Sequence, residues 1–366
     1  MSNWVFRENS LDMLRLFAAF QVVVMHTLGY MMPDYGSNAA LRILGYFPGV
    51  PIFFFISGYL ISKAFENSPN NIEYAKNRFL RLYPALIVCV GLNILMVAIT
   101  GYFSQVGASV ADVGLLFLAK ASFLQFWNPE FMRAFGDGVL NGSLWTICVE
   151  LQFYLITPFL YLVIPKDKRH GNYLLVALLF LFIVFNRILV LPEFDSSNEL
   201  IWKFYSVSFM PWLYMFITGI LFQRNFAFLS AFVSRISWLI LLPVYCIYTF
   251  FMIDLGFEAG NNVSPIVFFP LIFLIFRLAY LGTEKSNNLL RGNDISYGIY
   301  IWHMPIVNQM LFLNYGQSYL DVVIALMLTF LAAVASWVLV ERPAIQLKHV
   351  TLNSTFSKFN SKRVKR

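Results

Sequence analysis

The chain has 366 residues, of which 59% are hydrophobic and only 12% are charged. A soluble domain carries about 25% charged residues, so this composition excludes an ordinary soluble protein. The net charge of +7 would suit a nucleic-acid partner, but the basic residues are distributed as membrane topology requires. Cys89, Cys148 and Cys246 lie in apolar segments without metal-ligand spacing, so we interpret them as packing residues and expect neither disulfides nor a zinc site.

Apolar runs of about 20 residues recur from end to end, which predicts an all-α polytopic membrane protein with about ten transmembrane helices. The first run carries Asp12 and Arg15 and lacks a small-residue cleavage site, so we expect a retained helix instead of a signal peptide. A shorter apolar stretch, 113–127, contains Lys120 and predicts an interfacial or re-entrant helix. We place the spans near residues 11–32, 44–64, 85–103, 143–165, 173–191, 206–223, 236–254, 263–281, 294–313 and 319–340.

Ten spans would leave both termini on one side of the membrane, and that side would carry 21 of the 26 lysines and arginines. The positive-inside rule therefore predicts that both termini are cytoplasmic. We expect a single transmembrane domain over 1–345 and a basic cytoplasmic tail over 346–366. The tail suits a topology anchor or a lipid-surface contact better than a nucleic-acid site.

The first span contains Arg15 and His26, eleven positions apart. Eleven residues make about three turns, so both side chains lie on one helix face, about 16 Å apart along the axis. Arg15 alone could extend to the headgroups. His26 is too deep for that, and ionisable groups at such depth usually mark a pathway or an active site.

Glu150 lies about seven residues inside the span 143–165, at nearly the depth predicted for His26. A carboxylate at that depth needs a proton or a cationic partner. His26 is the nearest candidate by depth, and a carboxylate on one imidazole nitrogen raises the basicity of the other. The alternative is that Glu150 pairs with an arginine as a structural tie.

The second span begins with Pro48, Gly49 and Pro51, which predict a kinked or broken helix. Gly58 would allow the close approach of a helix or a ligand. Ser57 next to it has two interpretations, since its hydroxyl could donate to a substrate carbonyl or bond back to its own helix.

Arg78 and Arg81 precede the third span and face the same way. Arginine binds phosphate groups through two parallel hydrogen bonds, so the pair suits a phosphate ligand at the cytoplasmic surface. A stop signal for the span would explain one or two basic residues there equally well.

Tyr297, Tyr300 and His303 recur at three-residue intervals and line one face of the span 294–313. His303 lies near mid-membrane, where it could join the His26 site. A structural histidine with satisfied hydrogen bonds is the alternative.

Taken together and in order, these segments resemble the acyltransferase family 3 of membrane O-acyltransferases. The resemblance is carried by Arg15 and His26 at their spacing, the Phe-Phe-Phe-Ile-Ser-Gly-Tyr run at 53–59, Arg78-x-x-Arg81, the segments 143–154 and 296–303, and Glu341-Arg342-Pro343. It implies a ten-span acyltransferase domain that transfers an acyl group, commonly acetyl, from cytoplasmic acyl-CoA to a hydroxyl. The acceptors that it implies are surface polysaccharides (O-antigen, capsule or exopolysaccharide) or their lipid-linked precursors, at the bacterial cytoplasmic (inner) membrane.

The resemblance implies coenzyme A as the carrier of the acyl group. Coenzyme A is polyanionic, and its phosphates would bind to Arg78 and Arg81. His26 would be the general base on the acceptor hydroxyl, or would carry the acyl group itself. The other residues that we assign to the site are Arg15, Glu150 and Ser57 as catalytic residues and Tyr297, Tyr300, His303 and Trp145 as substrate-binding or supporting residues. We expect acetyl-CoA as the donor, no metal, and contacts with membrane lipids but not with nucleic acid.

Two other classes of protein fit part of the pattern. A transporter or flippase for a lipid-linked sugar would share the buried charges and the broken second span, but it does not need the paired cytoplasmic arginines. A purely structural membrane subunit would not explain why the ionisable side chains of His26 and Glu150 lie inside the membrane, where they are costly.

Overall fold

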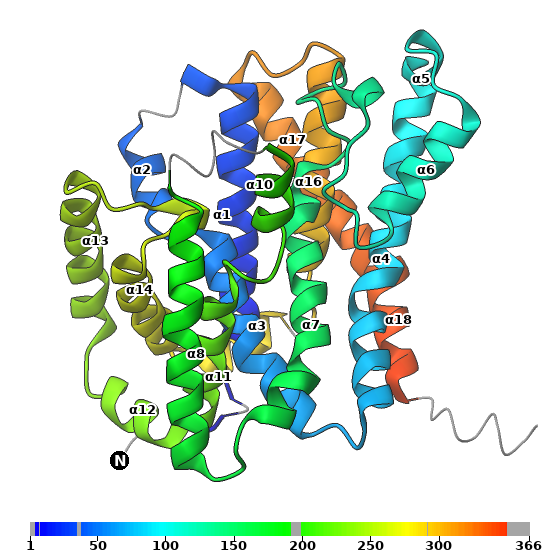
Figure 1. Ribbon diagram of the computed structural model, residues 1–366. Coiled ribbons are helices and arrows are strands. Elements are labelled where there is room, and N and C mark those ends of the chain that lie inside the picture. The colour runs from blue at the N-terminus through cyan, green and yellow to red at the C-terminus, as the bar shows by residue number, and fades with distance from the viewer. Residues whose placement is uncertain (1–3, 7, 35–37, 192–198, 291, 350–366) are drawn as a thin grey trace, which may run out of the picture.

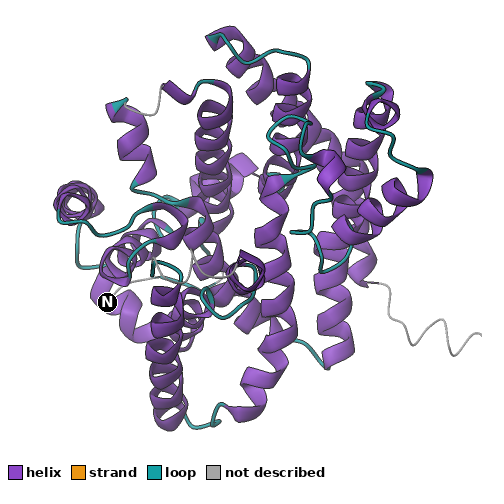
Figure 2. Cartoon of the chain, turned by 45° about the horizontal axis from the view of Figure 1, so that its top comes forward, coloured by secondary structure: helices purple, strands orange, loops and turns teal. Residues whose placement is uncertain are grey.

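The computed structural model describes residues 4–6, 8–34, 38–191, 199–290 and 292–349. The described residues form helices and loops, with no strand among them (Figure 2), which confirms the all-α prediction. Most of the predicted basic tail, 350–366, lies outside the described residues. The α-helices are α1 (Leu11–Met31), α2 (Ala39–Gly45), α3 (Gly49–Glu66), α4 (Asn71–Ile99), α5 (Tyr102–Gln105), α6 (Val110–Lys120), α7 (Trp145–Val163), α8 (Lys168–Ile188), α10 (Glu199–Ser206), α11 (Leu213–Arg224), α12 (Phe226–Val233), α13 (Trp238–Asp254), α14 (Pro265–Leu278), α15 (Thr283–Leu290), α16 (Ser296–Phe312), α17 (Tyr319–Ser336) and α18 (Arg342–Gln346).

Every predicted span coincides with a helix, but the helices differ in length. Within the described part of the chain, six helices are long and apolar enough to cross a membrane, or up to eight if each of two bent pairs forms one span. The bent pairs are α11 with α12, at 87°, and α14 with α15, at 79°. The protein is therefore a polytopic helical membrane protein, while the count of ten and the side of the termini stay predictions. The stretch 113–127 contains most of α6, which at 11 residues is too short to span.

The predicted break in the second span lies between α2 and α3. Pro48 is extended (φ −62°, ψ 121°) and caps α3. The next N–H, that of Gly49, donates to Gln21 Oε1 on α1 at 2.8 Å. A Cβ at Gly49 would lie 2.3 Å from the carbonyl oxygen of Ala18. The break thus lets the start of α3 pack directly against α1.

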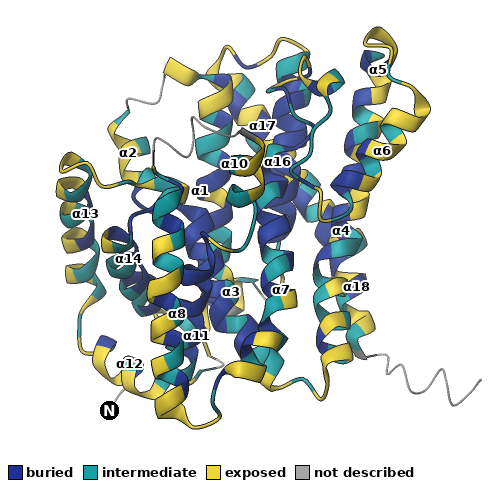
Figure 3. Cartoon of the chain, in the orientation of Figure 1, coloured by how far each residue is buried: buried dark blue, intermediate teal, exposed yellow. Residues whose placement is uncertain are grey.

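Two glycines bring α3 and α11 into backbone contact. A Cβ added at Gly58 would lie 1.9 Å from the carbonyl oxygen of Phe216, and one at Gly219 would lie 2.2 Å from that of Phe55. Of the two predicted uses of Gly58, close approach of a helix is therefore the observed one. The buried core lies on α3, α11 and α16, whereas α8 and α13 expose large apolar side chains, as lipid-facing helices do (Figure 3).

Several helix connections and the start of α1 lie at one end of the bundle, where the candidate site is found. The connections from α3 to α4 and from α7 to α8 lie at the same end as the start of α1 (Figure 1). Helix α4 begins at Asn71, well before the predicted span, so Arg78 and Arg81 lie on its first turns. Helices α1 and α16 pack side by side, and α1 also packs against α3.

Replacing Gly58 with alanine should destabilise the fold, because the new Cβ would overlap the backbone of α11. Forcing atoms into a packed interior costs about 1–3 kcal/mol. We expect a lower thermal unfolding temperature in detergent for Gly58→Ala. The control is Gly114→Ala on α6, where nothing lies within 4 Å of the added Cβ, and it should leave stability unchanged or slightly raised. Equal stability of the two variants would contradict the packing described here.

Candidate functional site

A basic cavity of about 310 Å³ opens at the end of the bundle that holds the start of α1. Its walls come from α1, α3, α4 and α7, from the segment before α16, and from α18 with the residues on either side of it. Five of the predicted site residues line it together, namely Arg15, Ser57, Arg78, Arg81 and Glu150. The structure therefore brings the predicted donor-binding arginines and three predicted catalytic residues onto one surface.

Asp294, which sequence reasoning missed, ties two of these arginines together. Arg15 Nη1 donates to Asp294 Oδ2 at 2.7 Å, and Arg81 Nη2 donates to the same oxygen. The other carboxylate oxygen accepts the backbone N–H of Ser296 at 3.1 Å. The available signal was an acidic residue directly before the apolar run of α16. Because Asp294 is buried, it neutralises part of the charge that Arg15 and Arg81 bring into the bundle.

Two other cations in the cavity form no ion pair with a described residue. Among the described residues, Arg78 forms no ion pair, and its guanidinium lies 5.7 Å from the ring centroid of Tyr154. Lys348 lines the same cavity. Burial, together with the positive charges of Arg78 and Arg81, lowers the pKa of Lys348 to about 8. The cavity therefore carries positive charge that an anionic ligand would stabilise.

Glu150 lies on the wall of the basic cavity and bonds to its neighbours on α3 and α7. Its Oε1 accepts from the Tyr154 hydroxyl at 2.6 Å and from Ser57 Oγ at 3.3 Å. The predicted pairing of Glu150 with His26 was wrong, because depth along a helix does not determine which way a side chain points around it. Ser57 donates to Glu150 and not to its own helix, so the second of its two interpretations was wrong, while donation to a substrate carbonyl stays a prediction.

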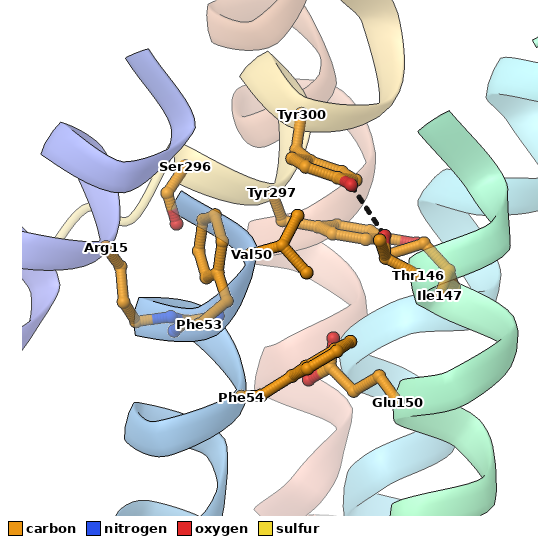
Figure 4. A pocket seen from close by; sticks show the side chains of 10 residues that line it. All are labelled: Arg15, Val50, Phe53, Phe54, Thr146, Ile147, Glu150, Ser296, Tyr297 and Tyr300. Carbon is orange, nitrogen blue, oxygen red and sulfur yellow. Dashed lines mark hydrogen bonds between the residues drawn. The ribbon is translucent and has the colours of Figure 1, made fainter. Parts of the chain in front are cut away.

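A smaller pocket of about 30 Å³, whose lining side chains are drawn in Figure 4, lies next to the basic cavity. Arg15 and Glu150 line both spaces. At its inner end Tyr300 OH and Thr146 Oγ1 lie 2.6 Å apart. Tyr297 also lines the pocket, and its hydroxyl donates to the carbonyl of Leu82 on α4 at 3.1 Å. Two of the predicted supporting tyrosines thus belong to the site.

The two intramembrane histidines lie beyond Tyr300. His26 Nδ1 and His303 Nε2 are 3.0 Å apart, and His303 Nδ1 lies 2.7 Å from the backbone carbonyl oxygen of Tyr300. His303 is fully buried and His26 is half-buried. His303 therefore contacts His26, as the first interpretation predicted, and both of its ring nitrogens have partners, as the alternative predicted. A catalytic part for His303 stays a prediction. Trp145 instead packs against Trp212, with ring centroids 5.2 Å apart, and lines neither space.

Pro305 explains why this part of α16 binds its neighbours so closely. Proline has no N–H, so the carbonyl of Ile301, four residues earlier, has no helical partner. That carbonyl accepts from Asn141 Nδ2 at 2.9 Å and from Cys89 Sγ at 3.4 Å. The backbone that carries His303 is thereby attached to α4 and to the turn before α7.

The arrangement places a cavity with several basic side chains next to a pocket lined by Tyr300, and the backbone carbonyl of Tyr300 contacts the imidazole pair. An imidazole can move a proton or form a covalent intermediate, and the arginines can hold phosphates. The described residues contain no group of three or more histidines, cysteines or acids that could hold a metal ion. These features define an enzyme-like site for an anionic co-substrate.

Comparison with known proteins gives the class of this enzyme. The model of an acyltransferase domain matches residues 8–341, so the chain belongs to this acyltransferase family. The match confirms the prediction of a membrane acyltransferase over the transporter and structural-subunit alternatives. No solved structure matches the chain.

Relatives with curated names match along most of the chain. Nodulation protein 10 of Rhizobium leguminosarum bv. viciae is 29% identical over 93% of this chain and 94% of its own length. The O-acetyl transferase of Shigella phage Sf6 is 27% identical over 92% of this chain and 96% of its own. The peptidoglycan O-acetyltransferase OatA of Listeria monocytogenes is 27% identical over 81% of this chain, which spans only 49% of that longer protein. With the family match, these similarities make the chain an enzyme of the O-acetyltransferase class.

Replacing Asp294 with asparagine should destabilise the protein strongly, because it leaves Arg15 and Arg81 side by side without their shared counter-charge. Breaking a buried ion pair on one side costs about 3–5 kcal/mol. The matched control is Glu130→Gln, which removes an exposed pair with Arg133 at 3.8 Å and should cost under about 1 kcal/mol. Denaturation in detergent measures both, and similar losses in the two variants would contradict the bridging role of Asp294.

Proposed function

We propose that this enzyme transfers an acetyl group from cytoplasmic acetyl-CoA to a hydroxyl of a cell-surface polysaccharide or its lipid-linked precursor. One observation carries the proposal. The basic cavity shares Arg15 and Glu150 with the smaller pocket, which Tyr300 lines, and the backbone carbonyl of Tyr300 binds His303. A polyanionic donor at one end and a base at the other are what acyl transfer from coenzyme A to a hydroxyl requires.

The donor would bind through its phosphates in the basic cavity. Arg78 and Lys348 supply positive charge that is not already shared with Asp294, and Arg81 adds to it. Charge-assisted hydrogen bonds to phosphate are roughly twice as strong as neutral ones. The phosphates would stay in this cavity while the thioester arm enters the narrower pocket.

Arg15 and His26 contact the α16 side of the bundle at two separate places, through Asp294 and His303, so we assign them different tasks. Eleven residues of helix separate them by about 16 Å, so both side chains cannot act on one carbonyl oxygen. We therefore assign Arg15 to orienting the donor, and His26 to the chemistry. His26 would take the proton of the acceptor hydroxyl, or would first accept the acetyl group as an acyl-imidazole.

The acceptor is proposed from the relatives and from the chemistry of O-acetylation. The names of two of them specify O-acetyl transfer, and one specifies peptidoglycan. A carbohydrate hydroxyl beyond the histidine pair fits a donor that approaches from the opposite end. We further propose the ten-span topology with cytoplasmic termini in a bacterial inner membrane, on the basis of the basic residues at the end that holds the α3–α4 and α7–α8 connections.

Replacing His26 with alanine should abolish transfer, because no other described residue at the inner end of the path offers an unengaged imidazole nitrogen. The assay follows labelled acetyl from acetyl-CoA into envelope polysaccharide, with O-acetyl signals read by NMR. His170→Ala is the matched control, since His170 is exposed and pairs with Asp167. Wild-type transfer by His26→Ala would sink the assignment. Label trapped on His26 in a single turnover without acceptor would select the acyl-imidazole route.

Replacing Arg78 with glutamine should weaken the donor interaction while the chemical step is retained. The loss of one charge-assisted hydrogen bond, about 1.5–3 kcal/mol, predicts a rise of roughly 10- to 100-fold in KM for acetyl-CoA. Lys63→Gln serves as the control, because Lys63 lies at the same end of the bundle but pairs with Glu66 outside the cavity. An unchanged KM in Arg78→Gln would remove the donor from this cavity.

A further inference from the structure

The hydrogen bonds of the histidine pair determine where its protons lie. A backbone carbonyl can only accept, so the nitrogen of His303 that lies 2.7 Å from the Tyr300 carbonyl, Nδ1, carries a hydrogen. A neutral imidazole has one N–H, so His303 Nε2 has a lone pair. The Nδ1 of His26 lies 3.0 Å from that lone pair and must donate to it. The remaining nitrogen of His26, Nε2, is then unprotonated.

The neutral form of the pair follows from its surroundings. His303 is fully buried, and an isolated charge is costly at such a place. The nearest predicted carboxylate, Glu150, is engaged by Ser57 and Tyr154 instead. Among the described residues, neither histidine forms an ion pair with an acid.

From this geometry we infer that His303 is a positioning residue that makes Nε2 of His26 the reactive nitrogen. This inference rests on the proposed function and specifies its base. In the transfer step, the lone pair of His26 Nε2 takes the hydroxyl proton of the acceptor while the hydroxyl oxygen bonds to the thioester carbonyl carbon. The carbon–sulfur bond then breaks, and the thiolate of coenzyme A takes the proton back from Nε2.

His303 would contribute at two moments of this step. Before it, the bond to His26 Nδ1–H holds the ring with Nε2 as acceptor, as the oriented imidazole of other hydrolytic and transfer enzymes requires. During it, His26 becomes a cation, and its Nδ1–H bond to the neutral His303 stabilises that charge. The Tyr300 carbonyl completes the chain, since it holds His303 in the one tautomer that can accept.

Two variants of His303 separate its two hydrogen bonds. In His303→Gln the amide group reaches about as far as Nε2, so its oxygen can still accept from His26 Nδ1–H. In His303→Asn the amide reaches only about as far as Nδ1, so the bond to the Tyr300 carbonyl is kept and the one to His26 is lost. Both replacements are polar and smaller than or similar to histidine, which makes each the control for the other.

We expect His303→Asn to lower kcat by roughly 100-fold or more, the usual contribution of a positioned base, with KM for acetyl-CoA unchanged. His303→Gln should retain kcat within about tenfold of wild type. If the role of His303 were purely structural, kcat would fall to a similar extent in both variants, or KM would change. Full activity of His303→Asn, or equal losses in the two variants, would overturn the inference.

A spectroscopic measurement tests the tautomer in the unmodified enzyme and does not depend on how well a variant folds. In protein labelled with ¹⁵N-histidine, with His26→Ala used to assign the signals, His26 should show a protonated Nδ1 and an unprotonated Nε2. The reverse pattern would overturn the inference. An inactive His26→Ala together with a fully active His303→Asn would overturn this inference alone, whereas an active His26→Ala would overturn the proposed function.

Discussion

The pairing of α1 with α16 is the constraint on which the site depends. The two helices are cross-linked twice, by Arg15 with Asp294 at one end and by His26 with His303 further along. The two helices run parallel, since residue numbers rise from the first pair to the second on both of them. The eleven residues of α1 between the pairs separate them by about 16 Å. The first cross-link lies on the basic cavity, and the second contacts the backbone carbonyl of Tyr300, which lines the smaller pocket. A shift of one helix along the other would disrupt both at once.

The two cross-links differ in what they require from the surrounding helices. The ion pair needs α4 as well, because Arg81 shares the Asp294 carboxylate and leaves Arg78 as the unpaired neighbour. The imidazole pair needs only α16 itself, through the carbonyl of Tyr300. Buried ion pairs are weak evidence for stability but can specify one arrangement among several. Here the bridge brings α1, α4 and the start of α16 to one place, which is where a polyanionic donor would bind.

The sequence predicted the helices and the residues of the site better than their partners. Each predicted span coincides with a helix, although short helices such as α12, α15 and α18 lie outside the spans. The spacing of Arg15 and His26 correctly predicted that they share one helix face, which follows from helical periodicity alone. The apolar runs could not predict the bends of 87° between α11 and α12 and 79° between α14 and α15, because apolar composition does not determine the direction of a helix axis. Depth gave Glu150 the wrong partner, and Asp294 was missed because nothing in one sequence shows that its oxygen lies between two arginines.

The hydrogen bonds of Glu150 change the roles that we assign to the residues of the site. With its Oε1 bonded to Ser57 and Tyr154, the carboxylate lies at the junction of the basic cavity and the inner pocket and cannot support His26. Arg15 lines the same two spaces, so both side chains lie where the donor would pass from the cavity to the pocket. In the proposed mechanism, support for His26 would then come from His303, the residue in contact with it.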